Sequence, residues 1–320
     1  MIKFRKAYWI KAMKTFEIVT LTVNPSLDKS THFSGLVAEQ KMRCELPHYD
    51  AGGGGINVSK AIARLGAASL AIYTAGGAIG KMLEELVAKE KIASIIIGVK
   101  ALTRENFIAF DNNTQSQYRF GFPGIAITPE EQQQIMQITI ASKPRYLVLS
   151  GSLNEGMPAD FYKNIIKEVK LQGTRVIVDT SGEPLQRALE AGVFLVKPNI
   201  GELAKLVGAD RLERNQIVPA AQQLIAKGNA EMVVVSLGAQ GAVLVTKDYE
   251  EWMAAPDVTK KSTVGAGDSM VGAMVWALSQ NKTPKEVLAW GVACGSAATM
   301  NEGTQLFKLQ DAEKILENGL

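Results

Sequence analysis

The chain has 320 residues, of which 47% are hydrophobic and 21% are charged, and its formal net charge is +3. This balance is typical of a folded globular protein with a large core, and it excludes a disordered chain. The charge is too small for a chain of this length to favour nucleic acid as a partner, and no apolar run reaches the ~18 residues that a membrane span needs.

The cysteines and the N-terminus bear on where the protein works. Cys44 and Cys294 lie far apart and outside any metal-ligand spacing. They favour free thiols in a reducing, cytoplasmic compartment, with a disulfide bridge as the alternative. Residues 1–13 are basic and aromatic but lack the apolar core of a secretory signal. We expect a disordered extension there, with a membrane-surface anchor as the alternative, ahead of one folded domain over residues 14–320.

The first predicted strand, residues 16–23, is rich in β-branched residues and runs into the turn Asn-Pro-Ser-Leu-Asp at 24–28. The last residue of this turn, Asp28, therefore follows a strand end, which is where α/β proteins bind their ligands. An aspartate that follows a proline is also a common turn residue, and this is the alternative role of Asp28.

Two separate segments predict a small additional sheet. Residues 29–50 lack helical periodicity, and we expect short strands there. In an extended strand the alternate residues Lys41 and Arg43 would place two cations on one face, as phosphate binding requires. Residues 103–122 contain two strand-like runs around a polar turn, the pattern of a β-hairpin. Together these segments predict a sheet that covers the mouth of the main domain, which is a candidate lid.

Four consecutive glycines, Gly52–Gly55, lead directly into a helix whose apolar residues fall on one stripe. A backbone without side chains lets a polar ligand approach closely, and Asn57 offers it both a donor and an acceptor. The glycines do not form the pattern G-x-G-x-x-G, and Gly80-Lys81 fails the Walker pattern at both ends. A dinucleotide fingerprint and a P-loop are therefore excluded.

From residue 128 onward, short apolar strands alternate with helices. This order predicts a mainly parallel sheet covered on both faces, which is a three-layer α/β/α domain. Ligands are expected at the carboxyl ends of such strands, where polar residues and glycines stand. These residues are Ser150, Gly151, Ser152, Asp179, Lys197, Asn199, Ser236 and Gly238. Asn199 and Glu202, three residues apart at a helix start, either cap that helix or hold the waters of a Mg²⁺ ion.

The segment Thr-Val-Gly-Ala-Gly-Asp at 263–268 stands immediately before a long apolar run, residues 269–278. Its glycines make the backbone turn sharply into a helix whose first N–H groups can bind an anion. Asp268 repels such an anion, and a carboxylate in this place suits a general base. A base beside an anion hole is what phosphoryl transfer requires, and a simple helix cap is the alternative role of Asp268.

In order and spacing, six segments resemble the ribokinase-like PfkB carbohydrate kinases, and the resemblance covers nearly the whole chain from about residue 14. The segments are residues 22–28, 51–57, 150–153, 197–202, 236–238 and 263–268. Within that family, the Asn-Pro-Ser-Leu-Asp turn is similar to the phosphosugar kinases. The four glycines followed by Ile-Asn-Val are most similar to the type II 6-phosphofructokinases, whereas 1-phosphofructokinases and tagatose-6-phosphate kinases usually carry Lys where Gly54 stands.

The resemblance implies a ribokinase-like fold with a β lid over about 29–50 and 103–122. It implies ATP-dependent transfer of a phosphoryl group to the 1-hydroxyl of fructose 6-phosphate, which yields fructose 1,6-bisphosphate in glycolysis. Tagatose-6-phosphate kinase and 1-phosphofructokinase are the alternatives within the class, and a non-catalytic sugar-phosphate sensor is the alternative outside it. The implied cofactors are ATP, Mg²⁺ and K⁺, and the implied assembly is a homodimer formed through the lid sheet, with no nucleic acid and no membrane as partner.

The resemblance also implies a role for each matching residue. The catalytic set is Asp268 as base, with an anion hole made by Gly265, Ala266 and Gly267. The sugar phosphate is held by Asp28, Lys41, Arg43, Gly53, Gly54, Asn57, Arg104 and Ser152, some of the cations coming from a partner's lid. The nucleotide is bound by Lys197, Asn199, Ser236 and Gly238. Mg²⁺ is held through water by Asn199 and Glu202, and K⁺ by the backbone of Ser262, Val264, Ala298, Asn301 and Gly303.

Overall fold

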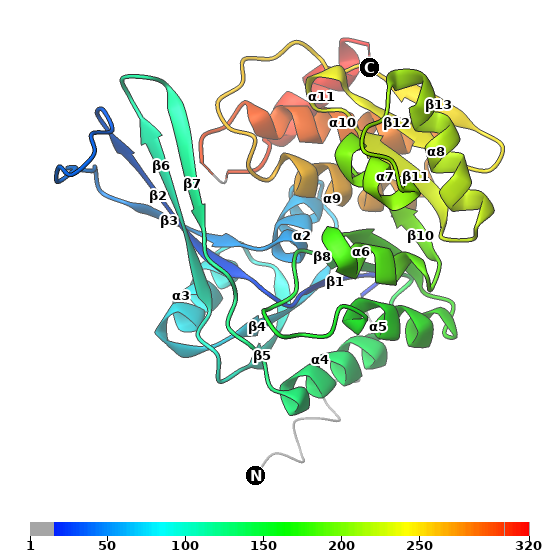
Figure 1. The fold of residues 1–320 in the computed structure, drawn as a ribbon, viewed down its shortest axis with the longest axis horizontal. Helices are drawn as coiled ribbons and strands as arrows, with labels where there is room; N and C mark the ends of the chain where they lie inside the picture. The colour runs from blue at the N-terminus through cyan, green and yellow to red at the C-terminus, as the bar shows by residue number, and fades with distance from the viewer. Residues whose placement is uncertain (1–15, 304, 320) are drawn as a thin grey trace.

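The computed structural model describes residues 16–303 and 305–319, and within them a nine-stranded sheet forms the centre of the molecule (Figure 1). Its strands are β1 (Ile18–Thr22), β4 (Leu70–Ala75), β5 (Ala93–Gly98), β8 (Tyr146–Ser150), β9 (Arg175–Asp179), β10 (Val193–Val196), β11 (Ala230–Ser236), β12 (Ala242–Val245) and β13 (Glu250–Met253). Their order is β13-β12-β11-β10-β9-β8-β1-β4-β5. All pairs from β11 to β5 are parallel, and β12 and β13 add an antiparallel edge.

Helices cover both faces of this sheet, which confirms the predicted three layers (Figure 1). One face carries α2 (Gly54–Arg64), α3 (Gly77–Lys89), α9 (Ala266–Ser279) and α10 (Pro284–Thr299), with α11 (Leu309–Glu317) packed against α10. The other face carries α4 (Pro129–Ser142), α5 (Phe161–Lys170), α6 (Gly182–Leu189), α7 (Ile200–Val207) and α8 (Arg214–Ala226). Strands such as β1 and β8 are buried along their whole length because helices lie above and below them.

The apolar stripe of α2 is buried as the sequence predicts, with Val58, Ala61 and Ile62 at 0% exposure. The sequence did not indicate α8 or α11. A proline inside α8, Pro219, removes a backbone donor from the helix, so the local pattern does not favour one. Among the described residues, no helix has both the length and the apolar character to cross a membrane.

A second, four-stranded sheet projects from one side of the molecule and confirms the predicted small additional sheet, which we call the lid sheet or lid (Figure 1). Its strands are β2 (Ser26–Phe33), β3 (His48–Gly52), β6 (Arg104–Asp111) and β7 (Ser116–Gly121), in the order β3-β2-β6-β7. The register pairs Asp28 of β2 with Asp50 of β3 and with Asn106 of β6. Because residues in register share a face of a sheet, these side chains lie on one face of the lid.

The prediction of a strand that carries Lys41 and Arg43 is wrong. Residues 34–47 form a loop between β2 and β3, in which Cys44 makes one isolated bridge to Phe33. Glu39 has a φ of 60°, which is a left-handed turn conformation that interrupts an extended strand. Lys41 and Arg43 are both exposed on this loop, so strand alternation does not set their direction.

Both cysteines are free thiols, Cys44 exposed and Cys294 buried, so the alternative of a disulfide bridge is excluded. Burial raises the pKa of the Cys294 thiol, which keeps it protonated and unreactive. The predicted extension at residues 1–13 lies outside the described residues.

Candidate active site

The first turn of α9 leaves its backbone donors without a side-chain cap. Its N-cap residue, Gly265, has a φ of 73°, a left-handed conformation that favours glycine, and no side chain caps the helix. By contrast, α4, α7 and α10 all begin with a capping box in which side chains bind the first N–H groups. The uncapped N–H groups and the helix dipole together make the start of α9 a place where an anion is stabilised.

Asp268 lies in this first turn and is held by the neighbouring helix. Asn57 of α2 donates a hydrogen bond from Nδ2 to Oδ2 of Asp268 at 2.8 Å. Burial raises the pKa of Asp268 to about 6, and the Asp179 carboxylate adds to the rise, while the Asn57 amide and the Lys197 ammonium oppose it. A carboxyl group with a pKa near neutrality is suited to accept a proton from a substrate hydroxyl.

Lys197 and Asp179 form an ion pair beside Asp268. Lys197 Nζ lies 3.2 Å from Asp179 Oδ1, and the lysine is buried at 8% exposure. Burial acts to lower the pKa of Lys197, but Asp179, Asp268 and Glu202 outweigh it and raise that pKa, so the ammonium stays charged. A Cβ atom placed on Gly267 would lie 3.5 Å from Lys197 Nζ, so the charge stands next to the N–H groups of α9. The sequence predicts Asp179 at the end of a strand but does not predict its ion pair with Lys197.

Asp28 lies on the lid side and is fixed by two neighbours. Ser26 Oγ donates to Asp28 Oδ1 at 2.7 Å, and Asn106 Nδ2 donates to the same oxygen at 2.8 Å. Burial raises the pKa of Asp28, and these hydrogen bonds together with the charges of Arg104 and Lys60 partly offset the rise. Sequence reasoning missed Asn106, because Asp28 is distant from it in the chain and the two meet only through the pairing of β2 with β6.

Arg104 begins β6 and connects the lid to the turn after β1. Its guanidinium donates to the Asn24 carbonyl at 3.3 Å and to Asn106 Oδ1 at 2.9 Å. Asn24 in turn donates from Nδ2 to Ser152 Oγ at 3.1 Å. Burial lowers the pKa of Arg104, and the charge of Asp28 opposes this; an arginine side chain stays charged in proteins. The structure therefore brings Arg104 and Ser152 together around Asn24, next to Asp28.

The glycine turn before α2 fits closely against β8. A Cβ atom on Gly54 would lie 2.1 Å from Ser150 Oγ, and Gly53 has a φ of 122° that a side chain would strain. Two buried polar atoms at this place, Ser150 Oγ and Asn57 Oδ1, have no hydrogen-bond partner among the described residues. Buried polar atoms are normally paired, so these two fit a ligand that carries hydroxyl groups.

Two of the predicted sugar-phosphate residues are not brought to this site. Lys41 and Arg43 lie on the exposed loop 34–47, and no hydrogen bond or ion pair joins either of them to the described residues of the site.

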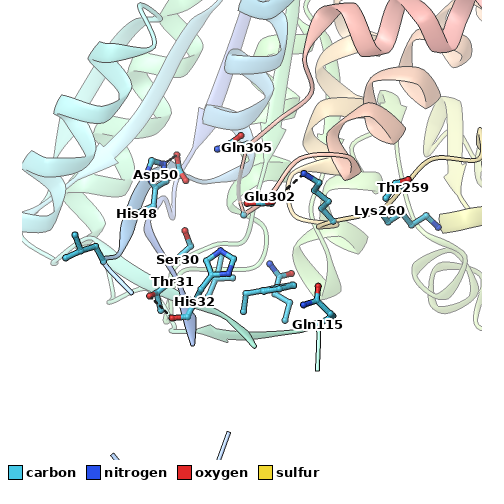
Figure 2. Close-up of a pocket in the computed structure, with 16 residues that line it drawn as sticks. Ser30, Thr31, His32, His48, Asp50, Gln115, Thr259, Lys260, Glu302 and Gln305 are labelled. Carbon is cyan, nitrogen blue, oxygen red and sulfur yellow. Dashed lines mark hydrogen bonds and ion pairs between the residues drawn. The ribbon is translucent and has the colours of Figure 1, made fainter. Parts of the chain in front are cut away.

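The lid contacts the anion-binding turn through Arg119 of β7, which donates a hydrogen bond to Thr263 Oγ1 at 2.9 Å. A cavity of about 460 Å³ is lined by residues of the lid sheet such as Ser30 and His32 and, from the loops near the start of α9 and the end of α10, by Lys260 and Glu302 (Figure 2).

A second cavity, of about 270 Å³, lies against α9 and α10 and is lined by Ala266 and Gly267 of the first turn of α9. Its walls include Ser236 and Gly238, which the sequence predicts to bind the nucleotide, and small residues such as Ala255 and Val292. Asn199 and Glu202 form the capping box of α7, in which Asn199 Oδ1 accepts from the Glu202 N–H at 2.9 Å. The capping alternative is therefore present in the structure, and the second oxygen of the Glu202 carboxylate accepts no hydrogen bond from the described residues.

The residues predicted to surround K⁺ come from two loops that are joined at Ser262. Ser262 Oγ donates to the Gly303 carbonyl at 2.9 Å, and the Ser262 N–H donates to the Thr299 carbonyl at 3.2 Å. Asn301 is tied to the end of α10 through its side chain, which donates to the Ala297 carbonyl at 3.1 Å. In the part of the chain that the structure describes, no group of three His, Cys, Asp or Glu side chains could hold a metal. The backbone carbonyl oxygens of these two loops are ligands of the kind that a hard monovalent cation accepts.

Residues 21–311 match the family described as pfkB family carbohydrate kinase. The chain therefore belongs to that family, as the sequence motifs predict. It is 43% identical over 300 residues to ATP-dependent 6-phosphofructokinase isozyme 2 of Escherichia coli (strain K12), which covers 93% of this chain and 97% of that one. The fold matches the crystal structure of phosphofructokinase-2 from Escherichia coli in complex with potassium, with a TM-score of 0.92, 42% identity and coverage of 95% and 99% of the two chains. It also matches the tetrameric inhibited form of that enzyme, with a TM-score of 0.89, 40% identity and the same coverage.

Proposed function

We propose that this protein is an ATP-dependent 6-phosphofructokinase that phosphorylates the 1-hydroxyl of fructose 6-phosphate. The observation that carries the proposal is Asp268, held by Asn57 at an uncapped helix start, with a pKa of about 6. The relatives described above support the choice of substrate, since they are named ATP-dependent 6-phosphofructokinase isozyme 2 and phosphofructokinase-2. Gly54 supports the same choice within the phosphosugar kinases.

In the proposed reaction, Asp268 accepts the proton of the sugar hydroxyl while the hydroxyl oxygen attacks the γ-phosphorus of ATP. The new bond joins this oxygen to phosphorus, and the bond to the bridging oxygen breaks, so that ADP leaves with the electron pair. The N–H groups of Gly265, Ala266 and Gly267 and the Lys197 ammonium stabilise the charge on the transferred group. Asp28 accepts a hydrogen bond from the sugar and fixes its orientation.

Two cations complete the proposal. Mg²⁺ would neutralise phosphate charge, and its waters would be held by Asn199 and Glu202 at the start of α7. K⁺ fits the loops joined by Ser262 because they present backbone carbonyls, and a relative has been crystallised in complex with potassium. Neither cation takes the proton, which goes to Asp268.

The proposed assembly is a homodimer in which the lid loop of one subunit reaches the sugar-phosphate site of the other. The loop 34–47 carries exposed Lys41 and Arg43 together with exposed Leu36, Val37 and Leu46, of which Leu46 is 96% exposed. Exposed apolar side chains beside cations favour a protein contact over a free loop. The molar mass in solution, measured with and without Leu46→Asp, tests this assembly, and a wild-type monomer contradicts it.

The proposed function is tested by ATP consumption in the presence of fructose 6-phosphate, tagatose 6-phosphate or fructose 1-phosphate. We expect the highest kcat/KM with fructose 6-phosphate. A preference for one of the other two sugars selects the corresponding alternative kinase. Binding of a sugar phosphate without any ATP turnover selects the sensor.

A further inference from the structure

Lys60 is a lysine that the fold buries close to the candidate active site. It lies on α2, one helical turn after Asn57, and its side chain is 3% exposed. Lysine is among the side chains least often fully buried, because its ammonium group loses hydration. Packing alone would be served better by an apolar side chain, so the ammonium group requires another explanation.

The partner of this ammonium group is the backbone of the lid. Lys60 Nζ donates a hydrogen bond to the carbonyl oxygen of Ala51 at 3.1 Å. Ala51 belongs to β3, where it pairs with Leu27 of β2, and the next pair along the two strands joins Asp50 to Asp28. Lys60 therefore links the helix that carries Asn57 to the lid strand that runs beside Asp28.

The covalent connection between these two elements is short and permissive. Between Ala51 and the start of α2 at Gly54 the chain contains only Gly52 and Gly53, and Gly53 has a φ of 122°. Glycine restricts the backbone less than any other residue, so the connection does not by itself fix the angle between β3 and α2. A charge-assisted hydrogen bond across this hinge does restrict that angle, and it is stronger than a bond between neutral groups.

The ammonium group of Lys60 also forms an ion pair with Glu90, which is long and partly exposed and therefore contributes little. Glu90 Oε1 lies 3.8 Å from Nζ, and Glu90 is itself 39% exposed. A cavity of about 550 Å³ opens beside Lys60 and is also lined by Arg64, Lys89 and Glu90. The positive charge of Lys60 also favours the ionised form of Asp28, whose pKa burial raises.

We infer that Lys60 is a positioning residue, whose ammonium group holds the Ala51 carbonyl so that the lid keeps Asp28 at a fixed separation from Asn57 and Asp268. The inference rests on the proposed function, because the enclosed space is the proposed sugar site. The nucleotide cavity lies against α9 and α10 and does not include the hinge. Loss of the contact therefore affects the sugar phosphate and not ATP.

Steady-state kinetics of matched variants test the inference. Lys60→Met keeps the aliphatic chain and removes the donor, and we expect its KM for fructose 6-phosphate to rise about tenfold with the KM for ATP unchanged. Lys60→Arg keeps a charged donor and restores the sugar KM to within about threefold of the wild type. Lys89→Met is the control, because Lys89 is exposed, lines the same cavity and makes no bond to Ala51. A wild-type sugar KM in Lys60→Met, or a loss that Lys60→Arg does not restore, overturns the inference.

Hydrogen exchange of the hinge provides a second readout that needs no substrate. We expect residues 48–55 to take up deuterium faster in Lys60→Met and at the wild-type rate in Lys60→Arg. Unchanged uptake in Lys60→Met overturns the inference. Because hydrogen exchange is measured without turnover, it tests the role of Lys60 even if the enzyme phosphorylates a different sugar. If Lys60→Met does not fold, the uncharged and shorter Lys60→Gln takes its place with the same expected direction.

Discussion

The Asn57 amide donates to Oδ2 of Asp268 at 2.8 Å, and this bond joins the glycine-led helix α2 to the first turn of α9. The two residues are far apart in sequence, and each follows a glycine-rich turn at the carboxyl ends of the parallel strands. The bond orients the carboxylate and favours its ionised form, while burial disfavours that form. The balance leaves a base whose pKa is close to the working pH of a typical enzyme.

The pH profile of the wild-type enzyme follows from this balance. Burial raises the pKa of Asp268 to about 6, and only the carboxylate can accept the proton of the sugar hydroxyl. We expect kcat/KM to be constant above this pKa and to fall about tenfold per pH unit below it. Initial rates between pH 5 and about 8, at constant ionic strength, check this. A profile that stays flat down to about pH 5 contradicts the assignment.

Replacing Asn57 should move that profile. Asn57 lowers the pKa of Asp268 through its hydrogen bond, so Asn57→Ala raises the pKa and shifts the acid limb of kcat to higher pH. We expect the same change to raise the KM for the sugar, because Asn57 Oδ1 is buried and has no hydrogen-bond partner among the described residues. The kcat profile, measured at saturating substrate, separates the two effects. An acid limb that does not move, or moves to lower pH, shows that Asn57 does not act on the base.

Lys197→Met removes the ammonium group that faces Asp179 and stands next to the N–H groups of α9. We expect kcat/KM to fall about a hundredfold, since a charge directed at the transferred phosphoryl group is lost. The acid limb of the pH profile should also shift to higher pH, because the Lys197 charge lowers the pKa of Asp268 and its removal raises that pKa. Lys205→Met, at an exposed position of α7, the helix that follows Lys197 in the chain, is the matched control and should keep wild-type kinetics. Equal effects of the two changes would assign the loss to surface charge.

Gly55→Ala tests the packing of the glycine turn independently of chemistry. A Cβ atom on Gly55 would lie 2.8 Å from the Leu21 carbonyl oxygen, which is backbone and cannot rotate away. We expect the free energy of unfolding to fall by about 1–3 kcal/mol. Gly98→Ala on the exposed edge strand β5, where nothing lies within 4 Å of the added atom, should change it by less than about 0.5 kcal/mol. Urea titrations of both variants make the comparison, and equal midpoints contradict the packing account.

The alternation of strands and helices was readable from the sequence because both faces of the sheet are buried, which gives β1 and β8 short, continuous apolar runs. The anion-binding turn at 263–268 was readable because its glycines and its aspartate are neighbours in the chain. The family follows from the same motifs and is confirmed by the match over residues 21–311. The roles of the individual site residues remain predictions.

Contacts that depend on sheet register could not be read from the sequence. Asn106 reaches Asp28 only because β6 pairs in parallel with β2. Asp179 reaches Lys197 across the ends of neighbouring strands β9 and β10. The prediction of a strand around Lys41 was wrong for a different reason. Alternating charges in a polar segment do not distinguish an exposed loop from an edge strand.

The most direct test of the whole account is the kcat of Asp268→Asn at saturating ATP and fructose 6-phosphate, with sugar binding measured separately. The amide has the size of the carboxylate but cannot accept the proton, so kcat should fall about a thousandfold or more while the sugar still binds. Asp248→Asn, at an exposed position in the turn between β12 and β13, is the matched control and should retain wild-type activity. An Asp268→Asn enzyme with a kcat within about tenfold of the wild type would contradict the assignment of Asp268 as the base.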